Sequence, residues 1–520
     1  MTPAAQPEFP DFYLPFGGKL DPGNRWVALT SFVPWDLVEK LYGRAFTDTG
    51  MGPPPLPGRV AFGALIIKER LGVTDEETVA QVRENPYLQY FLGYHEMLEE
   101  APFDPSMMVH FRKRFDQSAH DEINAETIRM AAEAEAENGD GDGDGDGDGD
   151  GDGDGDGDGD GDGAPANKGK LLIDASATPA DITYPTDLKL LNTARQKLEH
   201  IIDELHRPHI GTRSKPRTHR NRARRDYLNL TKLKKPGRRK LRKALGKQLR
   251  YIRRNLRHIK ELLAAGSELI QLPPRHYQNL LVATEIYRQQ HRMWKEKTRS
   301  TPDRIVSLSQ PWIRPIIRGK AAAKTEFGAK ISIGVNENGY TTLHQMSWDA
   351  YNESTDLPSQ AETYRKAHGS YPESIHADKI YRTRANRAWC KKNGIRISGP
   401  PLGRPRKETT NNAAELAALK KQTKEDEAIR NGVEGKLGNA KRKGTLSRVM
   451  AKLKETSLTT VNIAILVLNL DTRLRAALLC VLEELLRGWL RSVKRYTVQL
   501  EEISMSPLPP SRQPKGQLAT

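Results

Sequence analysis

The stretch Leu171-Leu172-Ile173-Asp174 decides the fold that we expect from this sequence. It is a short apolar run that ends in an acid, which is typical of a buried strand that delivers a carboxylate to a site. A second run of this kind, Ser374-Ile375-His376-Ala377-Asp378, lies two hundred residues further on. A third segment, Arg430 to Lys441, adds Glu434 in a basic, helix-like context. We expect these three segments to meet.

The charge of the chain indicates a polyanionic partner. Its 520 residues exceed one typical domain and suggest two to four units. The 82 Lys and Arg against 66 Asp and Glu give a net charge of +16, but twelve of the acids lie in one Gly-Asp tract. The remainder therefore carries 82 basic against 54 acidic residues, a net charge of +28. Because this charge is clustered, we favour nucleic acid over the alternative of simple solubility.

Cysteine and apolar patterns exclude several other classes. Cys390 and Cys480 are far apart and lack metal-ligand spacing, so neither a disulfide framework nor a zinc site is expected. Residues 1–16 show no signal-peptide pattern. The longest apolar run, 463–468, is far shorter than the roughly 18 residues of a membrane span, and we expect it in a core helix. A cytoplasmic protein without membrane association is expected.

The N-terminal part predicts helices from Val33 to Phe115. Thr74 and Glu77 form a capping-box pattern after a break at Gly72, and the flanking helices resemble a helix-turn-helix. The second of these helices begins with acids, which would repel phosphates. A better DNA-binding candidate is the helix after Asp104, for which we expect exposed basic side chains: His110, Arg112, Lys113 and Arg114. A purely structural helical bundle is the alternative.

Residues 139–162 are a strict Gly-Asp repeat, which has no apolar residue to bury and should form an extended, disordered linker. Residues 207–260 then carry twenty-two Lys and Arg and a single acid, Asp226. Apolar residues at alternating steps of four and three predict a core-facing seam under this basic face: Leu241, Leu245, Leu249, Ile252, Leu256, Ile259 and Leu263. We expect the face to bind DNA, with a membrane-surface helix or an RNA-binding arm as alternatives. The candidate contacts are Arg238, Arg239, Arg253 and Arg254.

The later sequence predicts a mixed α+β fold. Residues 330–335 alternate, Asn338-Gly339 favours a hairpin turn, and 340–348 supply the return strand. Helices at 357–368 and 383–392 and strands ending at 378 and 398 follow. We expect a mixed sheet flanked by helices, with a large helical insertion after the first strand.

Paired carboxylates of this kind suit phosphodiester chemistry with two divalent ions held about 3.5 to 4 Å apart. Asp174, Asp378 and Glu434 are therefore the candidate catalytic residues and metal ligands, with two Mg²⁺ or Mn²⁺ ions as cofactor. On a helix, Arg430, Glu434 and Lys441 share one face, so the two cations are candidate DNA contacts. Gly432, Gly435 and Gly438 weaken the helix prediction. Taken singly, an Asp at a strand end is more often a turn or cap residue.

These blocks resemble the DDE transposases of bacterial insertion sequences, in the group named after insertion sequence five. The resemblance rests on 32–115, which includes Phe103-Asp104-Pro105-Ser106, on Ile173-Asp174-Ala175-Ser176 with Tyr184-Pro185-Thr186-Asp187, on Ala377 to Tyr381, and on 430–441. The family signature is Tyr, two residues, Arg, three residues, Glu, six residues and Lys. This chain keeps Arg430, Glu434 and Lys441 but has Glu427 at the Tyr position.

The resemblance implies an RNase H-like catalytic core and a reaction in which the element's ends are cut and their 3′-hydroxyls attack target DNA. It also implies DNA partners, namely terminal repeats and target DNA, a homo-oligomer in the synaptic complex, and a place at the nucleoid in the bacterial cytoplasm. Two alternatives are a catalytically inactive DNA-binding protein and an RNase H-like nuclease that cuts without joining.

The expected domains follow from these patterns. They are an N-terminal extension (1–32), a helical DNA-binding domain (33–135), a disordered Gly-Asp linker (136–168), an RNase H-like catalytic domain (169–475) with a helical insertion at about 189–300, a C-terminal helix (476–503) and a disordered tail (504–520).

Overall fold

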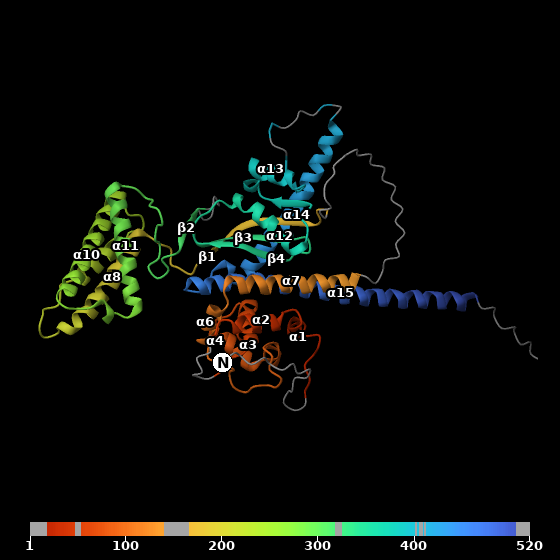
Figure 1. The fold of residues 1–520 in the computed structure, drawn as a ribbon, viewed down its shortest axis with the longest axis horizontal. Coiled ribbons are helices and arrows are strands. Elements are labelled where there is room, and N and C mark those ends of the chain that lie inside the picture. Colours follow the sequence, from red (N-terminus) through yellow and green to blue (C-terminus); the bar gives the residue numbers. More distant parts are fainter. Residues whose placement is uncertain are drawn as a thin grey trace, which may run out of the picture.

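A computed structural model describes residues 18–46, 54–139, 166–317, 325–400, 403–404, 409 and 412–505 (Figure 1). Most of the Gly-Asp tract and residues 506–520 lie outside the described residues, so disorder of the linker and of the tail stays a prediction.

The described N-terminal residues form helices around one apolar core. These are α1 (Arg25–Thr30), α2 (Trp35–Gly43), α3 (Gly58–Leu71), α4 (Asp75–Glu84), α5 (Pro86–Phe91), α6 (Met107–Arg114) and α7 (Gln117–Gly139). At the start of α4 the Thr74 side chain accepts a hydrogen bond from the Glu77 N–H, so the predicted cap is confirmed. Gly72 ends α3 with a φ of +67°, a left-handed conformation that favours glycine. Helix α3 is central, since Phe62, Ile66 and Ile67 are fully buried.

A mixed sheet forms the centre of the remaining chain. Its strands are β1 (Lys170–Pro179), β2 (Arg314–Ile317), β3 (Thr325–Asn336), β4 (Thr341–Ser347), β5 (Ser374–Ala377) and β6 (Arg396–Ile397). Their order is β2-β3-β1-β5-β6, and β4 also pairs with β3. Strand β1 is antiparallel to β3 and parallel to β5, so it is central. The predicted mixed sheet with flanking helices is confirmed.

The two faces of β1 pack against different helices. Leu171 and Ile173 belong to the core made with α12 (Leu357–His368) and α13 (Arg384–Lys392), whereas Leu172 belongs to the core made with α14 (Ala413–Lys443) and α15 (Lys454–Met505). Successive side chains of a strand point to opposite faces, so a strand covered on both faces needs a continuous apolar run. The predicted buried strand is confirmed. However, β1 continues to Pro179, so the expectation that it ends at Asp174 is wrong.

The hairpin between β3 and β4 forms where the sequence predicts it. The N–H of Gly339 donates to the carbonyl of Asn336 at 3.0 Å, and Gly339 has a φ of +83°. Helix α12 has the predicted bounds, and α13 is capped by Thr383 and followed by Gly394 at a φ of +65°.

The insertion after β1 is a separate bundle of helices beside the sheet (Figure 1). Its helices are α8 (Asp187–His206), α9 (Arg220–Thr231), α10 (Arg238–Ala264) and α11 (Pro274–Glu296). In the predicted seam of α10, Leu249, Ile252 and Ile259 are buried, and the seam leucines 245, 256 and 263 are partly buried against the same core. Only the first position, Leu241, is exposed, at 37%. The seam prediction is therefore confirmed over most of its length.

Helix α15 joins the N-terminal helices to the sheet. Ile463 and Leu466 belong to the N-terminal core, whereas Val461 and Ile465 belong to the core under the sheet. The Asn469 side chain bonds both backbone groups of Thr341 on β4, at 2.7 and 2.8 Å. The predicted core helix at 463–468 is confirmed, but α15 runs without a break across the predicted domain boundary at 475/476. Among the described helices, none combines the length and apolar character that crossing a membrane requires.

The buried histidine of α7 gives a prediction about stability. His120 is 4% exposed beside the rings of Phe62 and Phe115, and burial lowers its pKa to about 3, although Asp116 opposes the shift. The unfolded chain therefore binds a proton below pH 6.5 that the folded chain excludes, so the free energy of unfolding falls as the pH drops through 6.5. Between pH 7.5 and 5.5 we expect about 1.4 kcal/mol less stability from this group.

Urea unfolding of the wild type and of His120→Leu at both pH values measures this. The variant lacks the buried imidazole, so its loss of unfolding free energy between pH 7.5 and 5.5 should be about 1.4 kcal/mol smaller than that of the wild type. Equal pH dependence of the two proteins would contradict the prediction.

Candidate active site

The register of the sheet places Asp174 beside Asp378. Strands β1 and β5 run parallel, with Ile173 opposite Ala377, and the two acids are the next residues on each strand. Neighbouring strands lie about 4.8 Å apart, so the backbones of the two acids lie side by side. Asp174 remains in β1 and is half-buried, whereas Asp378 lies where β5 leaves the sheet and is exposed. The structure thus brings these two predicted acids together.

Helix α14 lies along the face of β1 that carries Asp174. By the two-residue period of a strand, Leu172, Asp174 and Ser176 share this face. Lys441 donates to the Ser176 hydroxyl at 2.7 Å, and a Cβ on Gly432 would lie 3.7 Å from the Leu172 side chain. Nine residues of helix and four of strand both span about 13 Å, so α14 runs alongside the strand between these contacts. The stretch of α14 that contains Glu434 therefore passes the level of Asp174.

Glu434 is placed on this helix but turned toward a cation. Its side chain is 56% exposed and forms an ion pair with Arg430 at 3.0 Å. Helix α14 continues through all three glycines without an irregular turn, and nothing lies within 4 Å of a Cβ built on Gly435 or Gly438. The three glycines therefore do not interrupt α14, and the segment from Arg430 to Lys441 is helical. Glu427, at the family's Tyr position, is exposed on the same helix.

The electrostatics of Asp174 show that the acids influence one another. Burial raises the pKa of Asp174 to about 6, the Ala175 N–H bonded to it at 2.8 Å opposes the shift, and the negative charges of Glu353, Glu434 and Asp378 add to it. All three predicted acids therefore act in one electrostatic field. A group of acids that repel each other favours the binding of a cation.

Sequence reasoning missed the fourth acid, Glu353. It lies in the short 3-10 helix Glu353–Thr355, where its carboxylate pairs with Lys330 of β3 at 2.9 Å. Lys330 also donates to the carbonyl of Tyr351 at 3.0 Å. Residues 349–356 carry no motif and no clear periodicity, so only the tertiary structure could bring this acid to the site.

The carboxylates do not converge as metal ligands in this structure. Within the described residues, no three His, Cys, Asp or Glu side chains come close enough to hold an ion. Glu434 is held by Arg430, and Asp378 accepts the N–H of Lys379 at 2.6 Å. The donor chemistry nevertheless fits a hard cation such as Mg²⁺, since all donors are carboxylate oxygens. An exposed Arg-Glu pair on a helix contributes only about 0.3 to 0.5 kcal/mol, so Glu434 can turn at low cost.

One predicted DNA contact of the N-terminal helices is not available. Arg112 was expected to be exposed, but it is 8% exposed and bonds Asp75 through both terminal nitrogens at 3.0 and 2.6 Å. The expectation is wrong because Asp75, which seemed to oppose DNA binding by α4, is the partner of this arginine. Lys113 is exposed, and Arg114 is half-buried with its guanidinium 3.9 Å from the centre of the Phe46 ring.

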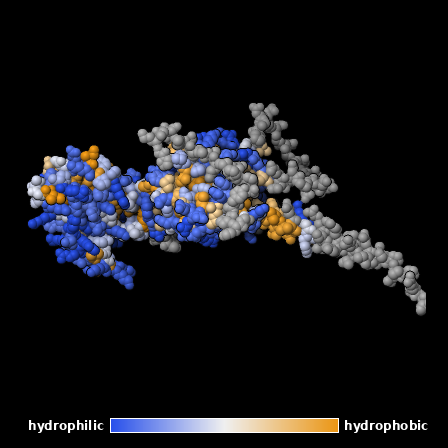
Figure 2. All heavy atoms as spheres, turned by 90° about the horizontal axis from the view of Figure 1, so that it is seen from below, coloured by the Kyte–Doolittle hydropathy of each residue, from blue (hydrophilic) through white to orange (hydrophobic). Residues whose placement is uncertain are grey.

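The cations of the insertion lie on its surface. Arg238, Arg239 and Arg253 are exposed, and Arg254 is half-buried over the ring of Tyr251. Figure 2 shows a mainly hydrophilic surface over this bundle, at the left of the view. These arginines belong to α10 and are far along the chain from Arg430 and Lys441, which flank Glu434 on α14.

The structure thus places Asp174 in a central strand and Glu434 on a neighbouring helix beside the cations Arg430 and Lys441. The comparisons with known proteins are more specific. Residues 375–471 match a family model described as a transposase DDE domain, and residues 15–114 match one described as a transposase domain. The first match contains Asp378 and Glu434. Together the two matches support a DDE transposase of insertion sequences, a family that normally uses a divalent metal.

A curated relative is similar over part of the chain. It is an uncharacterized protein, ORF8 in the nfe locus of Rhizobium meliloti, which is 25% identical over 179 residues. The alignment covers 34% of this chain and 73% of the relative.

The Lys330-Glu353 pair gives a prediction about the stability of the site. Lys330→Met leaves the Glu353 carboxylate partly buried and without its cation, near the negative charge of Asp174. We expect a loss of about 1 to 3 kcal/mol in the free energy of unfolding, measured by chemical denaturation. The double variant Lys330→Met/Glu353→Gln removes the unpaired charge and should recover part of this loss. A double variant as unstable as the single one would show that the charge is not the cause.

Proposed function

We propose that this chain cuts the ends of a mobile element and joins them to target DNA, as the finer form of its assignment to the transposases. The observation that carries the proposal is the register that sets Asp174 beside Asp378, with Glu434 in the same electrostatic field. We further propose that β1, β3, β5 and the flanking helices form an RNase H-like core, and that the group is that of insertion sequence five. The expected domain boundaries remain part of this proposal, as does action at the nucleoid in the bacterial cytoplasm.

We assign the roles of the residues from their positions. Asp174, Asp378 and Glu434 would hold two Mg²⁺ or Mn²⁺ ions, which activate the attacking oxygen and stabilise the leaving one. Asp174 supplies the most rigid carboxylate, because it lies within a central strand with neighbours on both sides. Glu434 reaches this carboxylate by leaving Arg430, which is then free to contact a DNA phosphate. Lys441 holds α14 against β1 through Ser176 and lies on the same side of the helix.

The remaining cations would position the DNA. The exposed arginines of α10 and Lys113 of α6 are placed to contact phosphates, and such contacts make binding steeply dependent on salt. Arg112 is not assigned to DNA, since its guanidinium is occupied by Asp75. The two alternative functions, a nuclease without joining and a DNA-binding protein without catalysis, lack an observation that favours them.

Three substitutions test the catalytic assignment. Asp174→Asn, Asp378→Asn and Glu434→Gln keep side-chain size and remove one charge each, and we expect each to reduce cleavage and joining by about a hundredfold or more, while binding of terminal-repeat DNA is retained. The measurement is incubation of purified protein with Mg²⁺ or Mn²⁺ and DNA that carries the terminal repeats, with products separated on a gel.

The matched control is Glu425→Gln, an exposed acid on the same helix α14, which should leave the products unchanged. Joined products support transposition, nicks alone support a nuclease, and a gel shift without products supports a binding protein. Wild-type activity of Asp378→Asn would refute the site.

The proposed homo-oligomer has a candidate interface on α15. Past Leu474 this helix leaves the packed part of the molecule and exposes large apolar side chains by 50 to 66%: Leu478, Leu479, Val481, Leu482, Leu485, Leu486, Trp489 and Leu490. Figure 2 shows this hydrophobic patch where α15 projects. Residues 478, 482, 485 and 489 follow the alternating steps of four and three that pair identical helices in coiled coils. A second copy of this chain is thus the partner that supports the proposal best.

A double substitution tests this interface. Leu482→Asp/Leu485→Asp places charges on the exposed face without touching the packed cores, and we expect the particle mass to fall from at least a dimer to 58.4 kDa in size-exclusion chromatography with light scattering. Leu281→Asp, at a 54% exposed leucine of α11, is the control and should leave the mass unchanged. A wild-type protein that is monomeric with and without DNA would contradict the prediction.

A further inference from the structure

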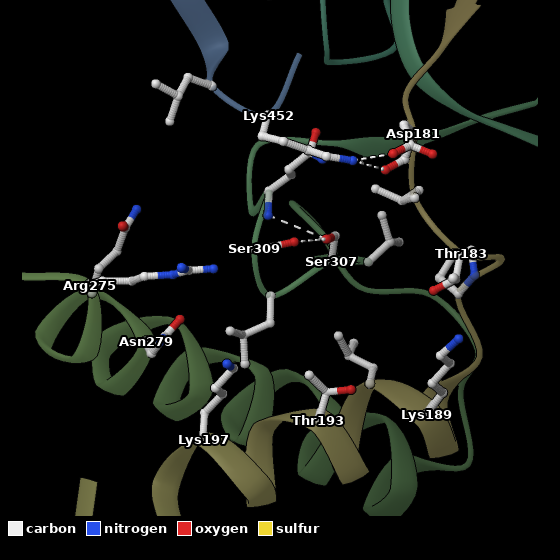
Figure 3. A pocket seen from close by; sticks show the side chains of 18 residues that line it. Asp181, Thr183, Lys189, Thr193, Lys197, Arg275, Asn279, Ser307, Ser309 and Lys452 are labelled. Atoms are coloured by element: carbon white, nitrogen blue, oxygen red, sulfur yellow. Dashed lines mark hydrogen bonds and ion pairs between the residues drawn. The ribbon is translucent and has the colours of Figure 1, made fainter. Parts of the chain in front are cut away.

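A cavity of about 750 Å³ lies where the insertion meets the end of β1 (Figure 3). It is formed by segments that are distant in sequence: 181–185 after β1, helix α8, the start of α11, the loop 306–310, and residues 452–453 before α15. Its volume is within the range of about 300 to 1,000 Å³ that is typical of ligand sites. The DDE acids do not line it, so the cavity is separate from the site described above.

Two lysines of α8 supply its positive charge. Lys189, Thr193 and Lys197 are spaced four residues apart, which places them on one face of the helix, and Figure 3 shows all three along the side that lines the cavity. Both lysines are half-buried. In the part of the chain that the structure describes, neither ammonium group has an acidic partner. Partly buried, unpaired cations of this kind are suited to an anionic ligand.

The acid at the rim does not neutralise this charge. Asp181 is the acidic residue of the lining, and its carboxylate is already bonded by Lys452 and Arg448. These two bonds hold the pKa of Asp181 below its usual value. Nearby Asp187 is likewise bonded, to Arg304 at 2.6 Å and to Gln290 at 2.8 Å. The field inside the cavity is therefore positive.

The opposite wall adds hydrogen-bond donors. Arg275 lies in the first turn of α11, at the positive end of the helix dipole. Ser307 and Ser309 contribute hydroxyl groups from the loop that closes the cavity. Guanidinium, ammonium and hydroxyl groups are donors from which phosphate oxygens accept hydrogen bonds.

The position of the cavity relates it to the acids. Asp181 follows Asp174 by seven residues along β1 and its extended continuation, in which Ala180 pairs with Val449. This extended chain spans roughly 23 Å, which corresponds to about seven nucleotide steps along one DNA strand. A strand held in the cavity can therefore continue to the carboxylates.

We propose that this cavity binds the backbone phosphates of DNA and anchors the strand about seven nucleotides from the bond that is cut. The inference rests on the proposed function and adds to it a contact between DNA and the junction of insertion and sheet. Lys189 and Lys197 are the main contacts, and Arg275 closes the opposite side.

The test compares salt dependence of DNA binding. Lys189→Ala/Lys197→Ala should weaken binding of a fluorescent terminal-repeat duplex about tenfold or more, and should reduce the slope of log Kd against log salt by about two, because two phosphate contacts are lost. The exposed single variant Arg275→Ala should reduce the slope by about one. Fluorescence anisotropy measures both quantities, and circular dichroism verifies the fold of each variant.

The control is Lys391→Ala/Lys392→Ala, which removes the same charge from exposed positions on α13, and it should keep the wild-type slope. If the cavity variants show the same affinity and the same salt slope as this control, the inference is overturned and the proposed function is left intact. A wild-type protein that fails to bind or cut DNA overturns the proposed function itself. A thermal shift with inorganic phosphate that depends on Lys189 and Lys197, without any change in DNA binding, would assign the cavity to a small free anion and also overturn the inference.

Discussion

The structure depends on the burial of β1 on both faces. Its odd-numbered apolar residues, Leu171 and Ile173, pack on one side with α12 and α13, and Leu172 packs on the other with α14 and α15. A shift of this strand by one residue would move Leu171 and Ile173 into the core formed with α14 and α15 and would turn Asp174 away from α14. Asp174 continues the face of Leu172, so the packing that stabilises the sheet also fixes the direction of the carboxylate. The parallel pairing with β5 then determines which acid stands beside it.

Among the described residues, several charged side chains form local pairs. Arg112 is neutralised by Asp75, Lys330 by Glu353, and Asp426 by Arg396. These pairs belong to the packed structure and are poorly suited to bind DNA. The cations that we propose to contact DNA lie mostly on the insertion and around the cavity at its base. The net positive charge that composition reveals is thus less informative than the subset of cations that folding leaves unpaired.

Helix α15 explains why the domains expected from sequence do not separate cleanly. Its residues around 461–470 alternate between two cores, one shared with α3 and α7 and one shared with the sheet. Helix α15, which lies in the C-terminal part of the chain, therefore stabilises the N-terminal helices. Past Leu474 the apolar side chains of the same helix are exposed, because the helix extends beyond the elements that cover its earlier part.

The sequence by itself determined the local elements and pointed to the three acids that we propose for the site. Hairpin, caps, the bounds of α12, the seam of α10 and the strand around Leu172 all follow from periodicity and turn residues, which act between near neighbours. Tertiary structure alone decided that Arg112 is buried against Asp75, that Glu353 joins the acids, that Asp174 lies inside β1, and that a cavity with Lys189 and Lys197 forms at the base of the insertion. Each of these depends on contacts between segments far apart in the chain, and no local pattern encodes which distant partner a charged side chain will meet.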